Sequence, residues 1–140
     1  MPVARSTRTL LVLFTALSGV TAVAQAQKTH EIQLEANREK EVYRFSPARV
    51  TAAPGDILVF KVVSGAPHSI VFEGKELPVT ARTALSQALG SRQGELSSPM
   101  LAKNGAVYRL VVPKLPEGNY PYFCLPHRAY DMRGEIVVKN

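Results

Sequence analysis

Short apolar segments separated by glycine and proline run through most of the sequence. The clearest is the apolar run at 57–63, which follows the turn residues Pro54, Gly55 and Asp56. A short apolar run bounded by turn residues is typical of a strand in the core of a sandwich. Further strands are expected at 32–34, 42–45, 49–52, 69–72, 106–112, 119–124 and 134–139. Strands at this spacing predict an all-β fold, specifically an antiparallel β-sandwich.

One segment, 80–89, departs from the strand pattern. Thr80 is a suitable N-cap, and Gly90 follows as a stop signal. Apolar residues repeat every four positions between them, at Ala81, Leu85 and Leu89. We therefore expect one short surface helix at 80–89 and a loop at 91–99. No chemistry is expected in residues 73–105.

The first 26 residues have the organisation of a secretory signal peptide. Arg5 and Arg8 precede an apolar centre at 10–17, and Ala24-Gln-Ala26 ends the segment. A membrane anchor is the alternative, but the strongly apolar part is well short of the ~20 residues that a spanning helix needs. We therefore predict Sec-type export to the periplasm, with residues 1–26 removed and no membrane-spanning segment left.

The remaining residues, 27–140, have the length of a single domain. Without Arg5 and Arg8, 15 lysines and arginines face 11 acidic residues, a net charge of +4. The simplest explanation is a basic solvated surface, and the sharper one is electrostatic steering towards an acidic protein partner. Nucleic acid is not an expected partner, because no dense Lys/Arg cluster lies beside an aromatic stacking pattern.

Four side chains that can bind a soft metal lie near the ends of expected strands. Cys124, the only cysteine, is followed by His127 and Met132 with the spacing C-x2-H-x4-M, and His68 lies in a separate loop. Exported chains commonly use cysteines in disulfide pairs, so a lone cysteine there favours a thiolate protected by a metal. Two histidines, one cysteine and one distant methionine are the ligand set of a blue-copper electron-transfer site.

Each of these residues has a simpler explanation when it is taken alone. His68 would more often be an ordinary loop histidine, Met132 a core residue and Cys124 an inert buried thiol. Their coincidence in one exported β-sandwich favours copper. Zinc is the main competitor, but a structural zinc site normally closes with four strong N or S ligands, which a methionine does not supply.

Catalysis is a different class of hypothesis. A Cys–His nucleophile needs an orienting group, and Asp131 is the one acidic candidate nearby. Multicopper oxidase or nitrite-reductase chemistry needs additional histidines, and only His30 remains. His30 is expected to be exposed and without function, and Met100 to serve in packing. The protein is therefore not expected to be an enzyme.

The sequence resembles the cupredoxins, the small blue-copper proteins of the plastocyanin and pseudoazurin kind. The similarity covers nearly all of 42–140, and the spacing C-x2-H-x4-M matches both of these proteins. The segments that carry it are Phe45-Ser-Pro47, Val50-Thr-Ala-Ala-Pro-Gly-Asp56, Ala66-Pro-His-Ser-Ile-Val-Phe72, Gly118-Asn-Tyr-Pro-Tyr-Phe-Cys-Leu-Pro-His127 and Met132-Arg-Gly134. The resemblance implies an eight-stranded Greek-key sandwich with one type 1 copper.

By this resemblance, the four copper ligands are His68, Cys124, His127 and Met132. His68 corresponds to the buried equatorial ligand and Cys124 to the ligand with the short covalent bond. His127 corresponds to the ligand at the solvent edge, through which the family usually passes electrons. Met132 corresponds to the weak axial ligand that tunes the potential.

The chain departs from the family pattern beside both histidines. In plastocyanins the first ligand histidine is usually followed by an asparagine that ties the two ligand loops together, and here Ser69 stands in its place. Small residues commonly follow the second histidine, whereas this chain has Arg128 and Tyr130. We expect these two residues to change the surface that partners meet.

These observations predict an exported blue-copper protein that shuttles single electrons by cycling between Cu(I) and Cu(II). Its partners would be a protein donor and acceptor, such as a c-type cytochrome, an oxidase or a reductase, with acidic docking surfaces. A monomer is expected. The alternative is a periplasmic protein that stores copper or delivers it to an exported oxidase, and the ligand set alone does not separate the two.

Overall fold

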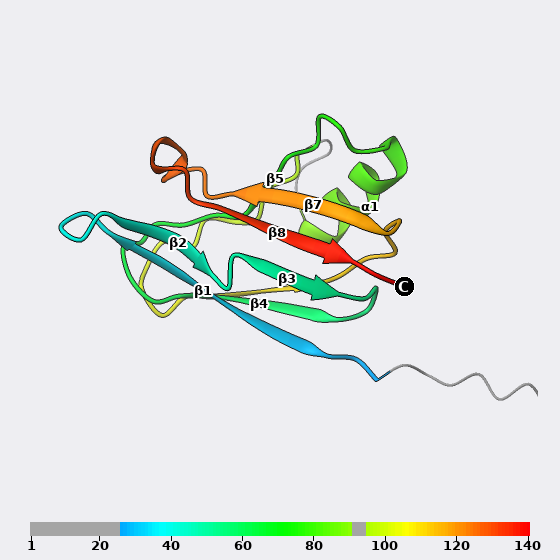
Figure 1. Cartoon of the computed structure of the whole chain (residues 1–140), viewed down its shortest axis with the longest axis horizontal. Helices are drawn as coiled ribbons and strands as arrows, with labels where there is room; N and C mark the ends of the chain where they lie inside the picture. Colours follow the sequence, from blue (N-terminus) through cyan, green and yellow to red (C-terminus); the bar gives the residue numbers. More distant parts are fainter. Residues whose placement is uncertain (1–25, 91–94) are drawn as a thin grey trace, which may run out of the picture.

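The computed structural model describes residues 26–90 and 95–140, which form two packed sheets and one short α-helix (Figure 1). The predicted signal peptide lies outside these residues except for Ala26, as do residues 91–94 of the predicted loop. The strands are β1 (Thr29–Asn37), β2 (Val42–Ser46), β3 (Arg49–Ala52), β4 (Ile57–Val62), β5 (Val71–Phe72), β6 (Val107–Val111), β7 (Gly118–Phe123) and β8 (Arg133–Val138). The eight-stranded sandwich is as predicted.

The strand pairing is mixed rather than purely antiparallel. One sheet has the order β2-β1-β4-β6 and the other the order β3-β8-β7-β5. β1 runs parallel to β4, and β3 runs parallel to β8, while the remaining pairs are antiparallel. The prediction of an antiparallel sandwich was wrong on these two pairs. Both pair strands that are not consecutive in the chain, so no local turn signal could indicate their direction.

Alternation along each strand divides the side chains between core and solvent. In β4, for example, Leu58, Phe60 and Val62 are buried, and the residues between them are more exposed. At the centre of the core, the ring of Tyr122 is met edge-on by Phe45 and Phe60, with ring centroids 4.9 and 5.7 Å away. Such edge-to-face contacts are a favoured aromatic geometry. They join β7 of one sheet to β2 and β4 of the other.

The helix α1 (Val79–Leu89) lies beside the sandwich and contacts β6. The predicted apolar face is confirmed, since Ala81, Leu85 and Leu89 are all buried. Gly90 ends the helix in the left-handed conformation, at φ 65°, which glycine adopts without steric cost. The predicted N-cap was wrong, because Pro78 occupies that position and Thr80 lies inside the first turn.

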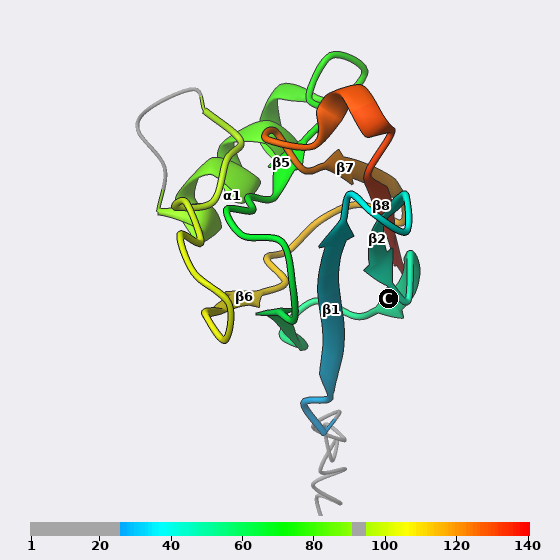
Figure 2. The ribbon, with the colours of Figure 1, turned by 90° about the vertical axis from the view of Figure 1, so that its left-hand side faces the viewer.

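Two loops meet at one end of the sandwich. β5 pairs with β7 so that Val71 lies opposite Phe123. The loop that enters β5 therefore lies beside the loop that leaves β7. This register brings residue 68 and residue 124 together, although they are far apart in the sequence. Figure 2 views the molecule from this end, with the short 3₁₀ turn η1 (Arg128–Tyr130) across from the turn between β1 and β2.

Candidate metal centre

The loop between β7 and β8 is fixed at both ends by backbone hydrogen bonds. Cys124 directly follows β7, and its N–H donates to the carbonyl of Met132 at 3.0 Å. The N–H of His127 donates to the carbonyl of Cys124 at 3.2 Å, which starts the turn that η1 continues. Asp131 then takes the left-handed conformation, at φ 55°, and returns the chain to β8. The loop is therefore short and closed, and it presents its side chains from a fixed frame.

Three of the four predicted ligands form a compact donor cluster. The Sγ of Cys124 lies 3.5 Å from Nδ1 of His68 and 3.4 Å from Nδ1 of His127. Within 26–90 and 95–140, these are the residues whose side chains group in the way that metal binding requires, with all three donor atoms within 4.8 Å of one another. A sulphur and two imidazole nitrogens converge on one point, as the sequence predicts.

The orientation of His68 is set by a second hydrogen bond. The side chain is completely buried, and Nε2 lies 2.8 Å from the carbonyl oxygen of Ser64. Because a carbonyl only accepts, Nε2 must carry the proton, which leaves the lone pair on Nδ1 facing Cys124. A metal-binding histidine commonly donates its other ring N–H to such an acceptor, which fixes its tautomer and orientation.

Burial shifts the acid–base equilibria of all three donors. It raises the pKa of the Cys124 thiol, against the opposing effect of backbone hydrogen bonds from Ser69 and His127. It lowers the pKa of His68, and it lowers that of His127 together with the nearby His68. Both imidazoles are therefore neutral at pH 7, the form that binds a metal, whereas the thiol must release its proton on metal binding.

Met132 immediately precedes β8, the strand in which the chain re-enters the sheet that contains β7. Its side chain is completely buried, and its carbonyl receives the N–H of Cys124. The thioether thus belongs to the buried end of the same loop as Cys124 and His127. Its role as the axial ligand stays a prediction.

Ser69 joins the two ligand loops by its hydroxyl group. The N–H of Leu125, next to Cys124, donates to Oγ of Ser69 at 3.3 Å. The tie that an asparagine usually makes in plastocyanins is therefore present in this chain with a shorter side chain. The backbone of Ser69 also approaches the Cys124 sulphur and lowers its pKa.

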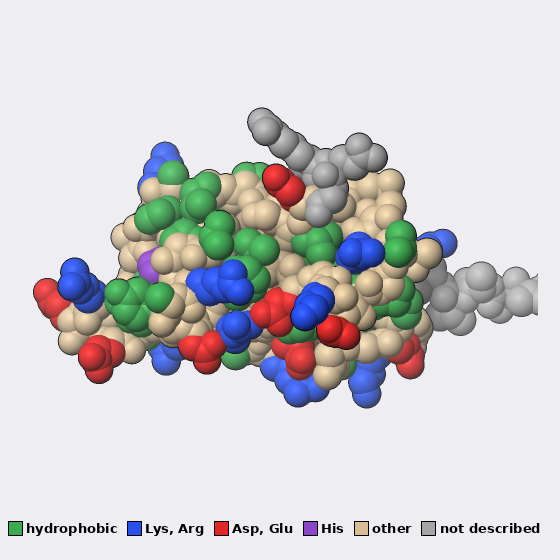
Figure 3. Space-filling view, turned by 90° about the horizontal axis from the view of Figure 1, so that it is seen from above, with side chains coloured by type: hydrophobic (Ala, Val, Ile, Leu, Met, Phe, Trp, Pro, Cys, Tyr) green, Lys and Arg blue, Asp and Glu red, His purple; other side chains and the backbone are tan. Residues whose placement is uncertain are grey.

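The surface around His127 is largely apolar. Leu125 and Tyr130 are each 52% exposed, and His127 itself is partly exposed. Seen from above, this end of the molecule shows a histidine side chain among hydrophobic ones (Figure 3). Arg128 does not cover this patch, because its guanidinium carbon lies 4.8 Å from the ring centroid of Phe123, on the outer side of β7. Tyr130 turns the other way and stacks on Tyr43.

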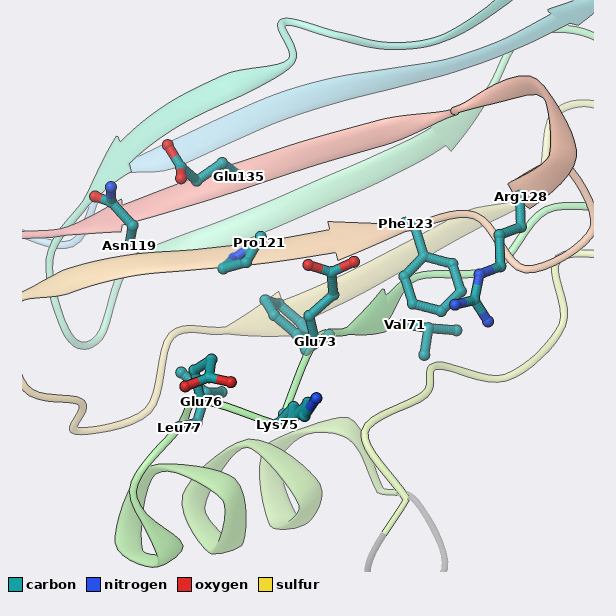
Figure 4. Close-up of a pocket in the computed structure, with 12 residues that line it drawn as sticks. Val71, Glu73, Lys75, Glu76, Leu77, Asn119, Pro121, Phe123, Arg128 and Glu135 are labelled. Atoms are coloured by element: carbon teal, nitrogen blue, oxygen red, sulfur yellow. The ribbon is translucent and has the colours of Figure 1, made fainter.

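A shallow groove of about 740 Å³ runs along the outer face of β5 and β7 (Figure 4). Its apolar floor includes Val71, Pro121 and Phe123, and Arg128 lies at one end. No motif in the sequence indicates this groove, because five of its twelve lining residues lie in the loop at 73–77, which carries none. Phe123 connects it covalently to Cys124.

Three other residues considered in the sequence lie outside the cluster. Asp131 pairs with Arg133, with the Arg133 Nε to Asp131 Oδ1 distance at 2.7 Å, so it does not orient His127 as a catalytic acid would. Met100 is 51% exposed, so the expectation that it serves in packing was wrong. The expectation that His30 is exposed was also wrong. Its side chain is only 23% exposed, and its Nε2 lies 2.9 Å from Oδ2 of Asp56, a residue distant in the sequence.

The donor set fits copper better than zinc. A thiolate and two imidazoles suit a metal that cycles between Cu(I) and Cu(II), with a thioether as a weak fourth donor. A closed zinc site would need a fourth strong N or S donor, and the described residues place no second cysteine or third histidine in the cluster.

An eight-stranded sandwich with this cluster between two loops at one end defines a cupredoxin. Residues 23–139 match the family described as copper binding proteins, plastocyanin/azurin family. Plastocyanin A/B of Petroselinum crispum is 34% identical over 94 residues, 67% of this chain and 86% of the relative. Plastocyanin of Rumex obtusifolius is 30% identical over 108 residues, 77% of this chain and 100% of the relative. The oxidised plastocyanin of Dryopteris crassirhizoma superposes with a TM-score of 0.60 at 23% identity, over 79% of this chain and 100% of that one.

The chain therefore belongs to the plastocyanin/azurin family of copper-binding proteins, and its cofactor is one type 1 copper. Among the residues that the structure describes, none of the helices has the length and apolarity that crossing a bilayer requires.

Proposed function

We propose that the protein is a periplasmic electron carrier that holds its copper with His68, Cys124, His127 and Met132. The observation that carries this proposal is the convergence of Cys124 Sγ with Nδ1 of both histidines within 4.8 Å. When bound, copper supplies one-electron chemistry between Cu(I) and Cu(II). The chain supplies a frame that is already shaped, so that little has to move when the electron moves.

The two histidines have different tasks in this proposal. His68 and Cys124 are completely buried, so they hold the metal away from water. His127 is partly exposed within the apolar end surface, where a partner protein can approach its ring. The electron would enter and leave through this edge.

The partners would be a protein donor and acceptor, such as a c-type cytochrome, an oxidase or a reductase. The net charge of +4 on residues 27–140 supports steering towards acidic docking surfaces. Because such steering is screened by salt, association should slow as ionic strength rises. Transfer by a monomer is sufficient, since all four proposed ligands come from one chain.

Copper storage or delivery is the second candidate, and the structure offers less support for it. Delivery needs a metal that leaves readily, but His68 and Cys124 are buried and the ligand loops are tied through Ser69. Dialysis against a chelator distinguishes the two functions. A carrier should keep its metal in both oxidation states, whereas a delivery protein should release Cu(I).

Absorption and EPR spectra after addition of Cu(II) test the proposed ligands. We expect an intense visible band with a narrow copper hyperfine splitting, which reports a thiolate bond. Cys124→Ala should abolish the band, and Met132→Leu should keep it and shift the reduction potential. His30→Ala, which changes a histidine outside the cluster, is the matched control and should leave the spectrum unchanged. A Cys124→Ala protein that stayed blue would refute the assignment.

A further inference from the structure

Two tyrosines, one on a strand and one in the ligand loop between β7 and β8, stack on each other. Tyr43 lies on β2, and Tyr130 is the last residue of η1. Their rings are almost parallel, at 5°, with centroids 3.9 Å apart. Tyr43 also faces His127, with ring centroids 5.5 Å apart and planes tilted by 43°. One ring on β2 therefore contacts both the turn and the proposed ligand that the turn carries.

The backbone hydrogen bonds of the turn do not fix it to the sandwich, and the side-chain bond of Asp131 reaches only to Arg133 at the start of β8. The N–H of Arg128 donates to Leu125 O at 3.3 Å, that of Tyr130 to His127 O at 3.0 Å, and that of Asp131 to Arg128 O at 3.1 Å. All of these bonds are local, so they shape the turn without anchoring it to another element.

The two halves of the ligand loop are anchored differently. The Ser69 hydroxyl holds the first half, at Leu125. The stack of Tyr130 on Tyr43 is the aromatic contact that joins the second half to the other sheet. Figure 2 shows the same arrangement at the level of the chain, with η1 lying close to the end of the sheet that contains β2. Tyr130 is still 52% exposed, so it is held at the surface and not within the core.

We propose that Tyr43 and Tyr130 act as positioning residues for His127, by clamping the C-terminal half of the ligand loop onto β2 through their stacked rings. The importance of this clamp for copper rests on the proposed ligand role of His127. The clamp itself is a property of the polypeptide and should hold the loop before any metal binds.

The contribution of the clamp can be bounded. Aromatic pairs of this kind stabilise proteins beyond their buried area by an amount that corresponds to about two- to tenfold in an equilibrium constant. Loss of the stack should therefore increase the equilibrium constant for local opening of the turn by about two- to tenfold. It should leave global unfolding much less affected, because the rings lie at the periphery of the core.

Hydrogen exchange on the copper-free protein tests the clamp directly. Tyr130→Leu should speed exchange of the amides of Arg128 and Asp131 by about two- to tenfold, while Tyr130→Phe, which keeps the ring, should restore slow exchange. Tyr108→Leu is the matched control, because it removes a partly buried tyrosine that packs on Phe60 instead. If Tyr130→Leu exchanged no faster than Tyr108→Leu, the clamp would be refuted.

A double-mutant cycle separates the stack from the effect of either ring alone. The effects of Tyr43→Leu and Tyr130→Leu on exchange should be strongly non-additive, because either change removes the same contact. Additive effects would overturn the proposal.

The copper-loaded protein provides the readout that a merely structural contact would not move. Tyr130→Leu should slow electron self-exchange by about two- to tenfold and change the EPR parameters, and Tyr130→Phe should restore both. Unaltered EPR parameters and self-exchange in Tyr130→Leu would overturn the positioning role even where copper binds. Absence of the visible band in the unsubstituted protein would instead refute the proposed function. The hydrogen-exchange data on the copper-free protein would still test the clamp, because they do not depend on that function.

Discussion

The contribution of a single residue is clearest at Ser69. A serine side chain is shorter than the asparagine that plastocyanins usually carry there, and the sequence alone left open whether the tie between the ligand loops is kept. The structure keeps it, because Oγ of Ser69 accepts the Leu125 N–H at 3.3 Å. Ser69 is only 1% exposed, so its hydroxyl acceptor is shielded from water, although Leu125 itself is 52% exposed. Loss of this acceptor would leave the Leu125 N–H without its partner and would destabilise the protein.

Ser69→Ala removes this acceptor and should destabilise the copper-free protein by about 1 kcal/mol. The measurement is the free energy of unfolding in urea, together with hydrogen exchange at Leu125, which should become faster. Ser69→Asn is the control, because an asparagine can present an acceptor at the same place. Equal protection of Leu125 in the serine and alanine proteins would show that the hydroxyl does not join the loops.

Two neighbouring strands, β7 and β8, approach closely at one glycine. Gly134 lies opposite Tyr122 in the ladder. A Cβ at Gly134 would lie 2.5 Å from ring atoms of Tyr122, whose ring is itself held by Phe45 and Phe60. The pairing of these strands therefore requires a residue without a side chain at 134. Since Met132 immediately precedes β8, the same packing sets where the ligand loop ends.

Gly134→Ala should destabilise the protein by about 1–3 kcal/mol, because the tyrosine ring cannot move out of a packed core. Thermal unfolding of the copper-free protein measures this loss. Gly74→Ala is the matched control: its Cβ would meet the end of the flexible Leu96 side chain, which can turn aside. A similar cost in the two variants would show that Tyr122 is free to adapt.

Elements with a strong local pattern could be predicted, and their partners could not. The buried face of α1 followed from Ala81, Leu85 and Leu89, and its end from Gly90, because these signals lie within a few turns of one another. β1 was recognised only at 32–34, whereas it extends from Thr29 to Asn37. Its residues 29–34 pair in parallel with β4, and this pairing, rather than alternation within the segment, keeps them extended.

At the scale of the whole molecule, the buried carboxylate of Asp56 joins segments that are distant in the sequence. Asp56 accepts N–H groups from Lys28 and Ala53 and lies 2.9 Å from Nε2 of His30. It thus connects the start of β1 to the turn between β3 and β4. Burial opposes the charge on Asp56, but the hydrogen bonds from His30, Lys28 and Ala53 outweigh it and hold the pKa at about 2, against an ordinary value of 3.8.

This depressed pKa predicts how the stability depends on pH. The contribution of Asp56, about 2 kcal/mol, is fully present above pH 3.8 and is lost as pH falls towards 2, where the folded protein also takes up the proton. Asp56→Asn should remove most of that acid-dependent component from urea unfolding curves of the copper-free protein. Asp131→Asn is the control, because Asp131 is 84% exposed and should contribute little. An unchanged acid slope in Asp56→Asn would contradict the assignment.

The donor cluster could be predicted because residue type and spacing along the chain carry the information. Cys124 and His127 share one loop, and Pro126 restricts the backbone conformations between them. The contacts that support the cluster were not predictable. Tyr43 carries no signal that it meets Tyr130, and His30 none that it meets Asp56, since each pair forms only when the sheets are assembled.

The donor cluster lies where the two sheets meet, and its donors are positioned by elements of both sheets. His68 is oriented by Ser64, which follows β4 in one sheet, while Cys124 continues β7 in the other. Copper bound by His68 and Cys124 as proposed would connect the two sheets, with the partly exposed His127 on its solvent side. For copper bound in this way, we expect the rate of release to follow the opening of the sandwich or of the ligand loop, and therefore to rise steeply with temperature.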